Sequence, residues 1–346
     1  MTVVELWNSH YSEEYESRFG QFQSCPFTMR IATLLKSAHV RKFAAESELE
    51  VPESIFESDG VDVREMRKRA LERIDYDTVV PPLPAVVEKI DRVISSPDVN
   101  FKQVAEVVAL DPALVTKILK LVNSPLYSLS REVKTIEQAV SFLGIKQVRH
   151  LTLTVSVVSS FEKNVIAGLD LDLYWQHSLM VAIGSRILAK VECDRGDTSI
   201  DPDEAFLAGL VHDVGRILIA SNFHDEQKQI AQRVMEHQDS YLDAELSILG
   251  YRHTDIGHAL TKRWNLSEQI QAAVLFHHEP ISQGPLPAIV SAADTLAHGL
   301  GFYTYTDKIQ ASDPSIWTEL DLSDLVIETA AMHMLEQFDA VRETVA

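Results

Sequence analysis

An apolar stretch near the middle of the chain constrains the fold more than any other part of the sequence. Residues 204–220 read EAFLAGLVHDVGRILIA, and we expect them to form one buried helix. His212 and Asp213 stand at the centre of this helix. A carboxylate is costly to bury without a partner, so the fold must give Asp213 an ion pair, a helix cap or a metal ion.

The composition excludes several classes of protein. The chain has 346 residues, 46% of them hydrophobic, which suits one large or two modest globular domains. It carries 31 Lys and Arg against 51 Asp and Glu, a formal net charge of −20, so general nucleic-acid binding is not expected. Cys25 and Cys193 form no CxxC motif and predict neither a disulfide framework nor a thiolate zinc site. The sequence contains no signal peptide or membrane-spanning run, which predicts a cytoplasmic protein.

Other histidines and aspartates that could act with His212 and Asp213 lie within, or at the ends of, strongly apolar predicted helices. Adjacent residues cannot both centre on one face of a helix, so further ligands must come from other helices. Nitrogen and carboxylate ligands without thiolates suit Fe, Mn, Mg, Ni or Zn, and a pair of such ions could activate water and clamp a phosphate. The candidate ligands are His177, His253, His277, His278 and Asp294.

A structural interpretation of each histidine competes with this metal site. A single His on an apolar helix is more often a hydrogen-bonded core or surface residue than a ligand. His258 lies five residues after His253, off its helix face, and is predicted to be structural. At a helix end, His277 and His278 would also be favoured as cations by the helix dipole. The histidines without supporting context are predicted at the surface: His10, His39, His150, His224, His237 and His333.

Helical periodicity and capping residues predict an all-α protein. Residues 1–75 are rich in charge and are expected to form an N-terminal helical extension with an acidic linker at 46–60. The prolines at 81, 82 and 84 mark a first lobe, residues 76–165, built from short capped helices at 84–94, 101–109, 113–122, 139–143 and 145–161. The second lobe, residues 166–346, is expected to hold helices 171–191, 204–220, 244–249, 253–264, 267–276, 287–300 and 322–341.

The order of the candidate ligands along the chain resembles a known signature. His177, the adjacent His212 and Asp213, and then Asp294 match the H…HD…D pattern of the HD superfamily of metal-dependent phosphohydrolases. The stretch LAGLVHDVGR at 207–216 is similar to the LLHDIGK helix of that superfamily. Residues 249–260 and 276–280 resemble its second-metal segments, and this resemblance implies that His253, His277 and His278 complete a second site.

The first lobe resembles a narrower family, the HDOD domains, which are HD-related output domains of bacterial signalling proteins. The matching segments are PLPAV at 82–86, DPALVTKILKLVNSPLY at 111–127 and TIEQAVSFLG at 135–144. The resemblance covers residues 77–300 and implies a bilobal all-α fold with a role in signal transduction or regulation. Many HDOD domains have lost HD ligands and are thought to act through interactions, whereas every HD position is occupied in this chain.

Two departures separate this chain from the HD-GYP phosphodiesterases that hydrolyse cyclic-di-GMP. Arg216 stands where the signature has Lys, which keeps the positive charge but changes its geometry. The residues that follow Glu279 read PISQGPLP and contain no Gly-Tyr-Pro. Both departures argue against hydrolysis of cyclic-di-GMP.

The sequence leaves three hypotheses open. The first is a bacterial-type signalling protein that acts mainly through contacts with partner proteins, as a monomer or a homodimer, and keeps a site for one or two divalent metal ions. The second is an active phosphohydrolase on a nucleotide or cyclic dinucleotide, in which Asp213 helps to hold metal and Arg216 steadies the phosphate. The third is a scaffold whose histidines only fill a core.

Overall fold

The computed structural model describes residues 79–345 except 97–98, 128, 130, 162–168, 197–198, 238–239 and 303–314. The helical extension predicted for residues 1–75 lies outside this part of the chain. Within the described residues, all regular secondary structure is helical, which confirms the predicted all-α class. No helix there is long and apolar enough by itself to cross a membrane, although the bent pair Pro202–Asn222 and His224–Val234 passes that test by length and composition.

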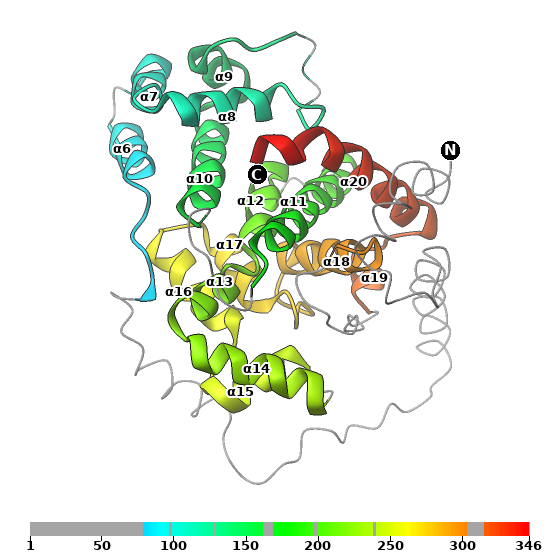
Figure 1. Cartoon of the computed structure of the whole chain (residues 1–346). Coiled ribbons are helices and arrows are strands. Elements are labelled where there is room, and N and C mark those ends of the chain that lie inside the picture. The colour runs from blue at the N-terminus through cyan, green and yellow to red at the C-terminus, as the bar shows by residue number, and fades with distance from the viewer. Residues whose placement is uncertain are drawn as a thin grey trace.

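Short helices with side-chain caps form the N-terminal part of the described structure (Figure 1). Asn100 and Gln103 make a reciprocal capping box at the start of α7. Asp111 accepts hydrogen bonds from the first N–H groups of α8, and Thr135 caps α9 in the same way. These caps confirm the predicted start of α7 and place the start of α8 one residue, and the start of α9 three residues, before the predicted positions. The helices are α6 (Ala85–Ile94), α7 (Phe101–Val108), α8 (Pro112–Val122), α9 (Ile136–Leu143) and α10 (Ile145–Phe161).

The second group of helices is arranged around the long helix α11 (Leu171–Asp194), which packs against α12 (Pro202–Val211), α18 (Pro285–Gly299) and α20 (Asp324–Val345). A glycine allows the closest of these approaches, because a Cβ on Gly209 of α12 would lie 2.8 Å from the Cα of Ala182 in α11. The remaining helices are α13 (Val214–Asn222), α14 (His224–His237), α15 (Tyr241–Leu249), α16 (His253–Arg263), α17 (Glu268–Phe276) and α19 (Ser315–Glu319).

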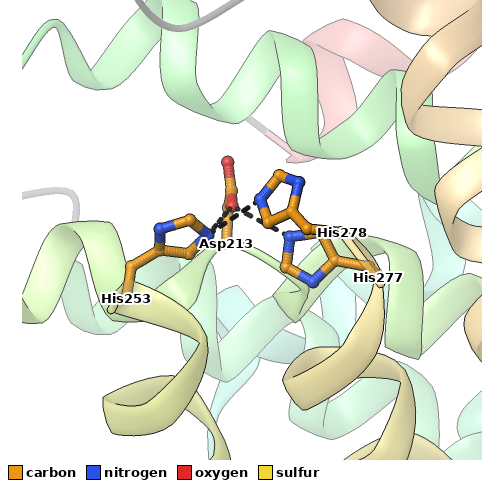
Figure 2. A group of neighbouring side chains, drawn as sticks. All are labelled: Asp213, His253, His277 and His278. Carbon is orange, nitrogen blue, oxygen red and sulfur yellow. Dashed lines mark hydrogen bonds and ion pairs between the residues drawn. The ribbon is translucent and has the colours of Figure 1, made fainter. Parts of the chain in front are cut away.

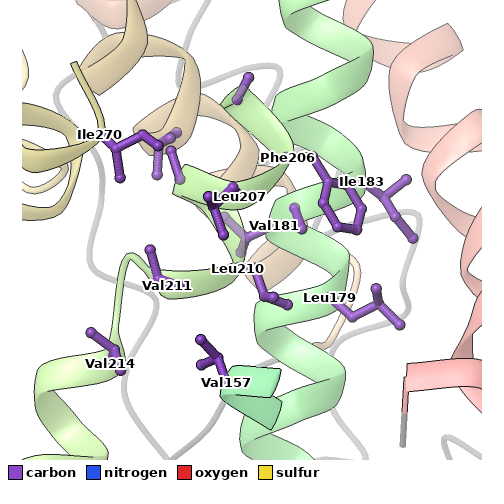
Figure 3. Packing of buried hydrophobic residues seen from close by; sticks show 14 of the residues in the cluster. Val157, Leu179, Val181, Ile183, Phe206, Leu207, Leu210, Val211, Val214 and Ile270 are labelled. Atoms are coloured by element: carbon purple, nitrogen blue, oxygen red, sulfur yellow. The ribbon is translucent and has the colours of Figure 1, made fainter. Parts of the chain in front are cut away.

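One hydrophobic core continues through both groups of helices. Figure 3 shows Val157 of α10, Val181 of α11 and Leu210 of α12 within this core. Burying a side chain of this kind stabilises the fold by roughly 1.5–3 kcal/mol relative to its exposure. A polar contact joins the same groups, since Trp264 Nε1 at the end of α16 donates to the carbonyl oxygen of Pro81 at 3.0 Å. The predicted lobe boundary at residue 165 falls between α10 and α11 and stays a prediction.

The single helix predicted for residues 204–220 is wrong. Helix α12 ends at Val211 and α13 begins at Val214, so His212 and Asp213 form the corner between two helices. Asp213 has φ −100° and ψ 10°, outside the helical range. Apolar periodicity cannot reveal this break, because the residues on both sides of it are buried in the same core. The corner lets the His212 and Asp213 side chains leave the chain in different directions.

Smaller differences from the predicted helices follow from local capping and from polar sequence. Residues 192–203 were expected to be a loop, but α11 continues to Asp194 and α12 begins at Pro202 behind its N-cap Asp201. Helix α14 was not predicted, because its sequence is polar. Helix α15 begins at Tyr241 rather than at residue 244, because Ser240 accepts a hydrogen bond from the N–H of Asp243.

Candidate metal centre

The structure brings all the predicted metal ligands together in the second group of helices. They form two sets, in each of which the ligand atoms lie within 4.8 Å of one another. The first set is Asp213, His253, His277 and His278. Figure 2 shows the three imidazole rings of this set turned toward the Asp213 carboxylate. The second set is His177, His212 and Asp294.

Asp213 lies between the two sets. Its Oδ1 is 3.0 Å from His253 Nε2 and 3.5 Å from His277 Nε2. Its Oδ2 is 3.6 Å from His212 Nε2 and 3.9 Å from His177 Nε2. One carboxylate oxygen therefore faces each set, which places Asp213 where it could bridge two ions.

Gly215 allows α13 to approach the start of α16 closely enough for these contacts. A Cβ at this position would lie 1.9 Å from the carbonyl oxygen of His253 and 2.9 Å from Ile256 Cγ2. Real Cβ atoms do not approach a carbonyl so closely, so any other residue would push α16 away. The glycine of the His-Asp-Val-Gly sequence thus serves the site through packing.

Backbone carbonyls orient the rings of three candidate ligands. His177 Nδ1 lies 3.0 Å from the backbone oxygen of Phe302. His212 Nδ1 lies 2.7 Å from the oxygen of Gly209, and His277 Nδ1 lies 3.0 Å from the oxygen of Val274. A carbonyl can only accept, so each Nδ1 carries the hydrogen and each neutral ring has a lone pair on Nε2. A hydrogen bond from Nδ1 to a backbone carbonyl is typical of histidines that bind metal through Nε2.

The inward-facing atoms fit a cation. His177 Nε2 and His212 Nε2 are 3.3 Å apart, and two lone pairs at that distance repel unless a positive charge lies between them. Asp213 Oδ1, Asp294 Oδ1 and His277 Nε2 are buried and face other side chains of the centre, with His277 Nε2 3.5 Å from Asp213 Oδ1. Ligand atoms about 2.1 Å from one ion are about 3.0–3.4 Å apart, close to the separations found here. The residues present therefore fit a divalent metal ion.

Electrostatics keep the carboxylates of the centre ionised and two of its rings neutral. Burial alone would raise the pKa of Asp213, but Arg216 and the neighbouring imidazoles hold that pKa well below its usual range. The pKa of Asp294 is also well below its usual range, because His298 and His177 outweigh the effect of burial. Burial lowers the pKa of His212 to about 3 and the pKa of His278 well below its usual value. Ionised carboxylates and neutral imidazoles are the forms that bind metal. His253 differs from the other two rings, because Glu245 and Asp213 raise its pKa to about 9 against the effect of burial, so it would lose a proton when metal binds.

Arg216 lies against the centre rather than at a distance from it. Its Nε is 2.9 Å from Asp213 Oδ2, and its guanidinium carbon lies 5.0 Å from the centroid of the Tyr241 ring. The side chain is only 8% exposed. Arg216 therefore supports the Asp213 carboxylate directly, and its expected contact with a phosphate stays a prediction.

Two residues of the site carry roles that the sequence did not predict. His298 Nδ1 lies 3.0 Å from Asp294 Oδ1, and the spacing of four residues on one helix was a signal for this contact. Glu245 binds His253 Nδ1 through both carboxylate oxygens, at 2.8 and 3.0 Å. A Glu within the mostly apolar residues 244–249 was a weaker signal of the same kind as Asp213.

The predictions for the remaining histidines have mixed outcomes. His150 was expected at the surface but is 7% exposed in α10, because this helix packs against α12. His258 is half-buried and its Nδ1 lies 3.3 Å from the Gln271 oxygen, in agreement with a structural role. His224 and His333 are exposed as predicted. His10, His39 and the side chain of His237 lie outside the described residues.

Similarity to known proteins agrees with this fold. The chain is 27% identical over 267 residues to an uncharacterized protein of Treponema pallidum (strain Nichols), covering 75% of this chain and about half the length of that relative (50%). The crystal structure of an HDOD domain protein of unknown function from Geobacter sulfurreducens has a TM-score of 0.60 and 28% identity, covering 82% of this chain and 98% of that one. A Marinobacter aquaeolei VT8 protein, provisionally named a signal transduction protein, has a TM-score of 0.62 and 22% identity, covering 82% and 65%.

The match to a protein family extends over both groups of helices. Residues 80–280, more than half of the chain, match the HDOD domain. This range begins at the prolines before α6 and includes the His212–Asp213 corner, the Gly215 contact and the His277–His278 pair. The chain belongs to the HDOD domain family.

Proposed function

We propose that this protein is a signal-transduction protein that acts through contacts with partner proteins and holds divalent metal ions as part of its regulated state. The observation that supports the metal part is the convergence of both ligand sets on Asp213. The HDOD family assignment and the name of the Marinobacter protein support the signalling part.

The two ligand sets would divide between two ions. His177, His212 and Asp294 would hold one ion together with Asp213 Oδ2, and Asp213 Oδ1 would join the other set. When bound, the ions supply positive charge that offsets the buried carboxylates and can polarise a phosphate oxygen. Fe, Mn, Mg, Ni and Zn all suit this mixture of imidazole and carboxylate.

Burial of the ligands favours regulation over catalysis. The rings of His177, His212, His253 and His277 are at most 1% exposed. A substrate as large as a cyclic dinucleotide needs an open approach to both ions, and side chains this deeply buried offer little of it. The protein would then use the metal to hold one arrangement of its helices, and the partner would read that arrangement.

Elemental analysis of protein purified without chelator tests the metal centre. The wild type is expected to contain between one and two equivalents of a divalent metal. Asp213→Ala removes the carboxylate shared by both sets and is expected to contain less than about a tenth of an equivalent, on the expectation of a tight site. Asp225→Ala, an exposed aspartate on α14, is the matched control and should keep the wild-type content. Equal metal contents in wild type and Asp213→Ala would contradict the proposal.

A metal-dependent phosphohydrolase is the second candidate function. The observation that favours it is the bridging position of Asp213, since two-metal phosphohydrolases need one such carboxylate. A hydrolysis screen with nucleotides, cyclic dinucleotides and a chromogenic phosphodiester separates the two functions. Turnover that vanishes in Asp213→Ala and persists in Asp225→Ala would favour the enzyme. Equal residual rates in all three proteins would leave the signalling function as the better account.

A further inference from the structure

Helix α15 contributes no candidate ligand to the metal centre, yet it contacts one candidate ligand directly and contacts the arginine that pairs with another. Glu245 lies on this helix and contacts His253, while Tyr241 lies four residues earlier and contacts Arg216. Residues four apart on a helix share one face, so both contacts come from the same side of α15. Helices α14 and α15 lie side by side (Figure 1), and Tyr241 and Glu245 face the centre from one side of α15.

The contact between Glu245 and His253 is the more specific of the two. Glu245 Oε2 accepts from His253 Nδ1 at 2.8 Å and from the His253 backbone N–H at 2.9 Å. Glu245 is 1% exposed and His253 is 0% exposed. The carboxylate thus satisfies one of the free N–H groups at the start of α16 and also sets the orientation of the ring.

This orientation points the other ring nitrogen into the centre. His253 Nε2 lies 3.0 Å from Asp213 Oδ1 and 3.2 Å from His278 Nε2. Among the described histidines of the two ligand sets, His253 is the one whose Nδ1 meets a carboxylate, whereas His177, His212 and His277 meet carbonyl oxygens. A carboxylate partner makes an imidazole a stronger donor to metal than a carbonyl does.

We propose that Glu245 is a positioning residue for the ligand set of Asp213, His253, His277 and His278, and that it links metal binding there to the packing of α14 and α15. The proposal rests on the proposed metal centre. Tyr241 strengthens the link, because Gln227 of α14 donates to its hydroxyl at 2.7 Å and its ring lies beside Arg216, which holds Asp213. Linkage is reciprocal, so metal bound at this set would stabilise the packing of α14 and α15 by the same free energy by which that packing strengthens metal binding.

Metal titration of chelator-treated full-length protein tests the role of Glu245. Mn²⁺ or Zn²⁺ alone is the probe, and binding is measured by calorimetry. Glu245→Gln keeps the shape and one acceptor but removes the charge, and it is expected to weaken one of two binding events by about 10–100-fold. The matched control is Glu204→Gln, another buried glutamate, which pairs with Lys146 and Ser267 instead. Glu204→Gln should leave both binding events unchanged.

Hydrogen exchange supplies a readout that a purely structural role would not move. In the wild type, metal is expected to slow amide exchange within residues 241–249 by at least about tenfold, a coupling of roughly 1.4 kcal/mol. This slowing should be lost in Glu245→Gln and kept in Glu204→Gln. If circular dichroism shows that Glu245→Gln does not fold, Glu245→Asp takes its place, because it keeps the charge and shortens the side chain by one methylene.

The possible results distinguish the two proposals. A wild type that binds no metal overturns the metal centre and the role of Glu245 together. Normal metal binding and normal slowing of exchange in Glu245→Gln overturn only the role of Glu245. Equal losses in Glu245→Gln and Glu204→Gln would assign the effect to general loosening of the fold and would also overturn it.

Discussion

Asp213 shows how one side chain can satisfy opposing demands within a core. It is 3% exposed, and its two oxygens face different ligand sets while Arg216 supplies the nearest positive charge. In the absence of metal this ion pair stabilises the carboxylate together with His253, whose pKa Glu245 and Asp213 raise to about 9 against the effect of burial. The ion pair with Arg216 and a bound metal ion would therefore both offset the buried negative charge of Asp213.

Asp213→Asn is predicted to destabilise the metal-free protein. The amide leaves the Arg216 guanidinium buried without its counter-charge, and breaking a buried pair in this way costs about 3–5 kcal/mol. Urea unfolding in the presence of chelator measures the change. Asp225→Asn removes an exposed partner of Lys228 and should shift the free energy of unfolding by less than about 1 kcal/mol. An Asp213→Asn variant as stable as wild type would show that Arg216 finds another partner.

Gly215→Ala is predicted to weaken metal binding from a distance. The new Cβ would meet the His253 carbonyl at 1.9 Å, which forces α13 and α16 apart, displaces His253 and costs about 1–3 kcal/mol or more. Thermal unfolding and metal titration are the two measurements. Gly257→Ala is the control in the same interface, since its tightest Cβ contact would be the movable Val274 Cγ1 at 3.0 Å, and the backbone nitrogen of Gly215 would lie at an ordinary 3.4 Å. A larger effect from Gly257→Ala would contradict this account.

The site could be predicted from sequence as far as the types and order of its residues allow. The seven predicted ligands do converge, and each lies within, between or at the ends of buried helices, where an unpartnered polar side chain is costly. Glu245 escaped notice because a hydrogen bond across eight residues and a helix boundary leaves no periodic signal. His150 was misplaced because its helix buries polar side chains such as Thr152 and Thr154 as well as apolar ones.

At the scale of helices, the contact between α10 and α12 joins the two groups through charged side chains. Lys146 Nζ lies 3.1 Å from Asp201 Oδ2 and 3.4 Å from Glu204 Oε2. His150 lies one turn further along α10, and burial together with the Lys146 charge lowers its pKa to about 4. This contact therefore buries a neutral imidazole beside a cation.

His150 is predicted to make the protein less stable in acid. Below about pH 6.5 the unfolded state binds a proton on His150, while the folded state stays neutral down to about pH 4. Between about pH 6.5 and pH 4 the unfolded state thus binds more protons than the folded state. As the pH is lowered through this window, the free energy of unfolding decreases by at most about 3 kcal/mol. Urea unfolding from pH 7 to pH 4 should show a shallower fall in His150→Leu than in wild type. His333→Gln, at an exposed site on α20, should follow the wild type.

Helix starts could be predicted well and helix interruptions could not. Asn100, Asp111, Thr135 and Ser267 cap their helices through contacts within three residues, which the local sequence contains. The corner at residues 212–213 depends instead on the packing of α13 against α16, which no local pattern records. Starts fixed by these local caps were thus predicted to within a few residues, whereas the Ser240 cap of α15 was missed and the break at residues 212–213, which depends on neighbours in space, was not predicted.

At the scale of the molecule, the ligands tie together most of the second group of helices. The candidate ligands come from α11, from the corner between α12 and α13, from α16, from the residues that follow α17, and from α18. Most of these helices also contribute to the one hydrophobic core that continues into the first group. Metal bound at the centre would therefore oppose unfolding of the chain as a whole.

Metal is predicted to raise the unfolding temperature of the wild type. A ligand present at 100 times its dissociation constant stabilises the folded state by about 2.7 kcal/mol. For a chain of this size, with an unfolding entropy of about 2.1 cal/mol/K per residue, each kcal/mol corresponds to about 1–2 °C in Tm. Calorimetry with chelator and then with excess Mn²⁺ measures the shift. Asp213→Ala should show no shift, and a shift equal to that of wild type would place the stabilising ion elsewhere.

The hydrogen bond from Trp264 to Pro81 connects the C-terminal end of α16 to the segment before α6. His253 stands at one end of this helix and Trp264 directly follows the other, about 16 Å away at 1.5 Å per residue. Pro81 precedes α6, so this end of α16 is joined to the first group of helices. A displacement of the chain at Pro81 would therefore act on the helix whose first residue is the candidate metal ligand His253.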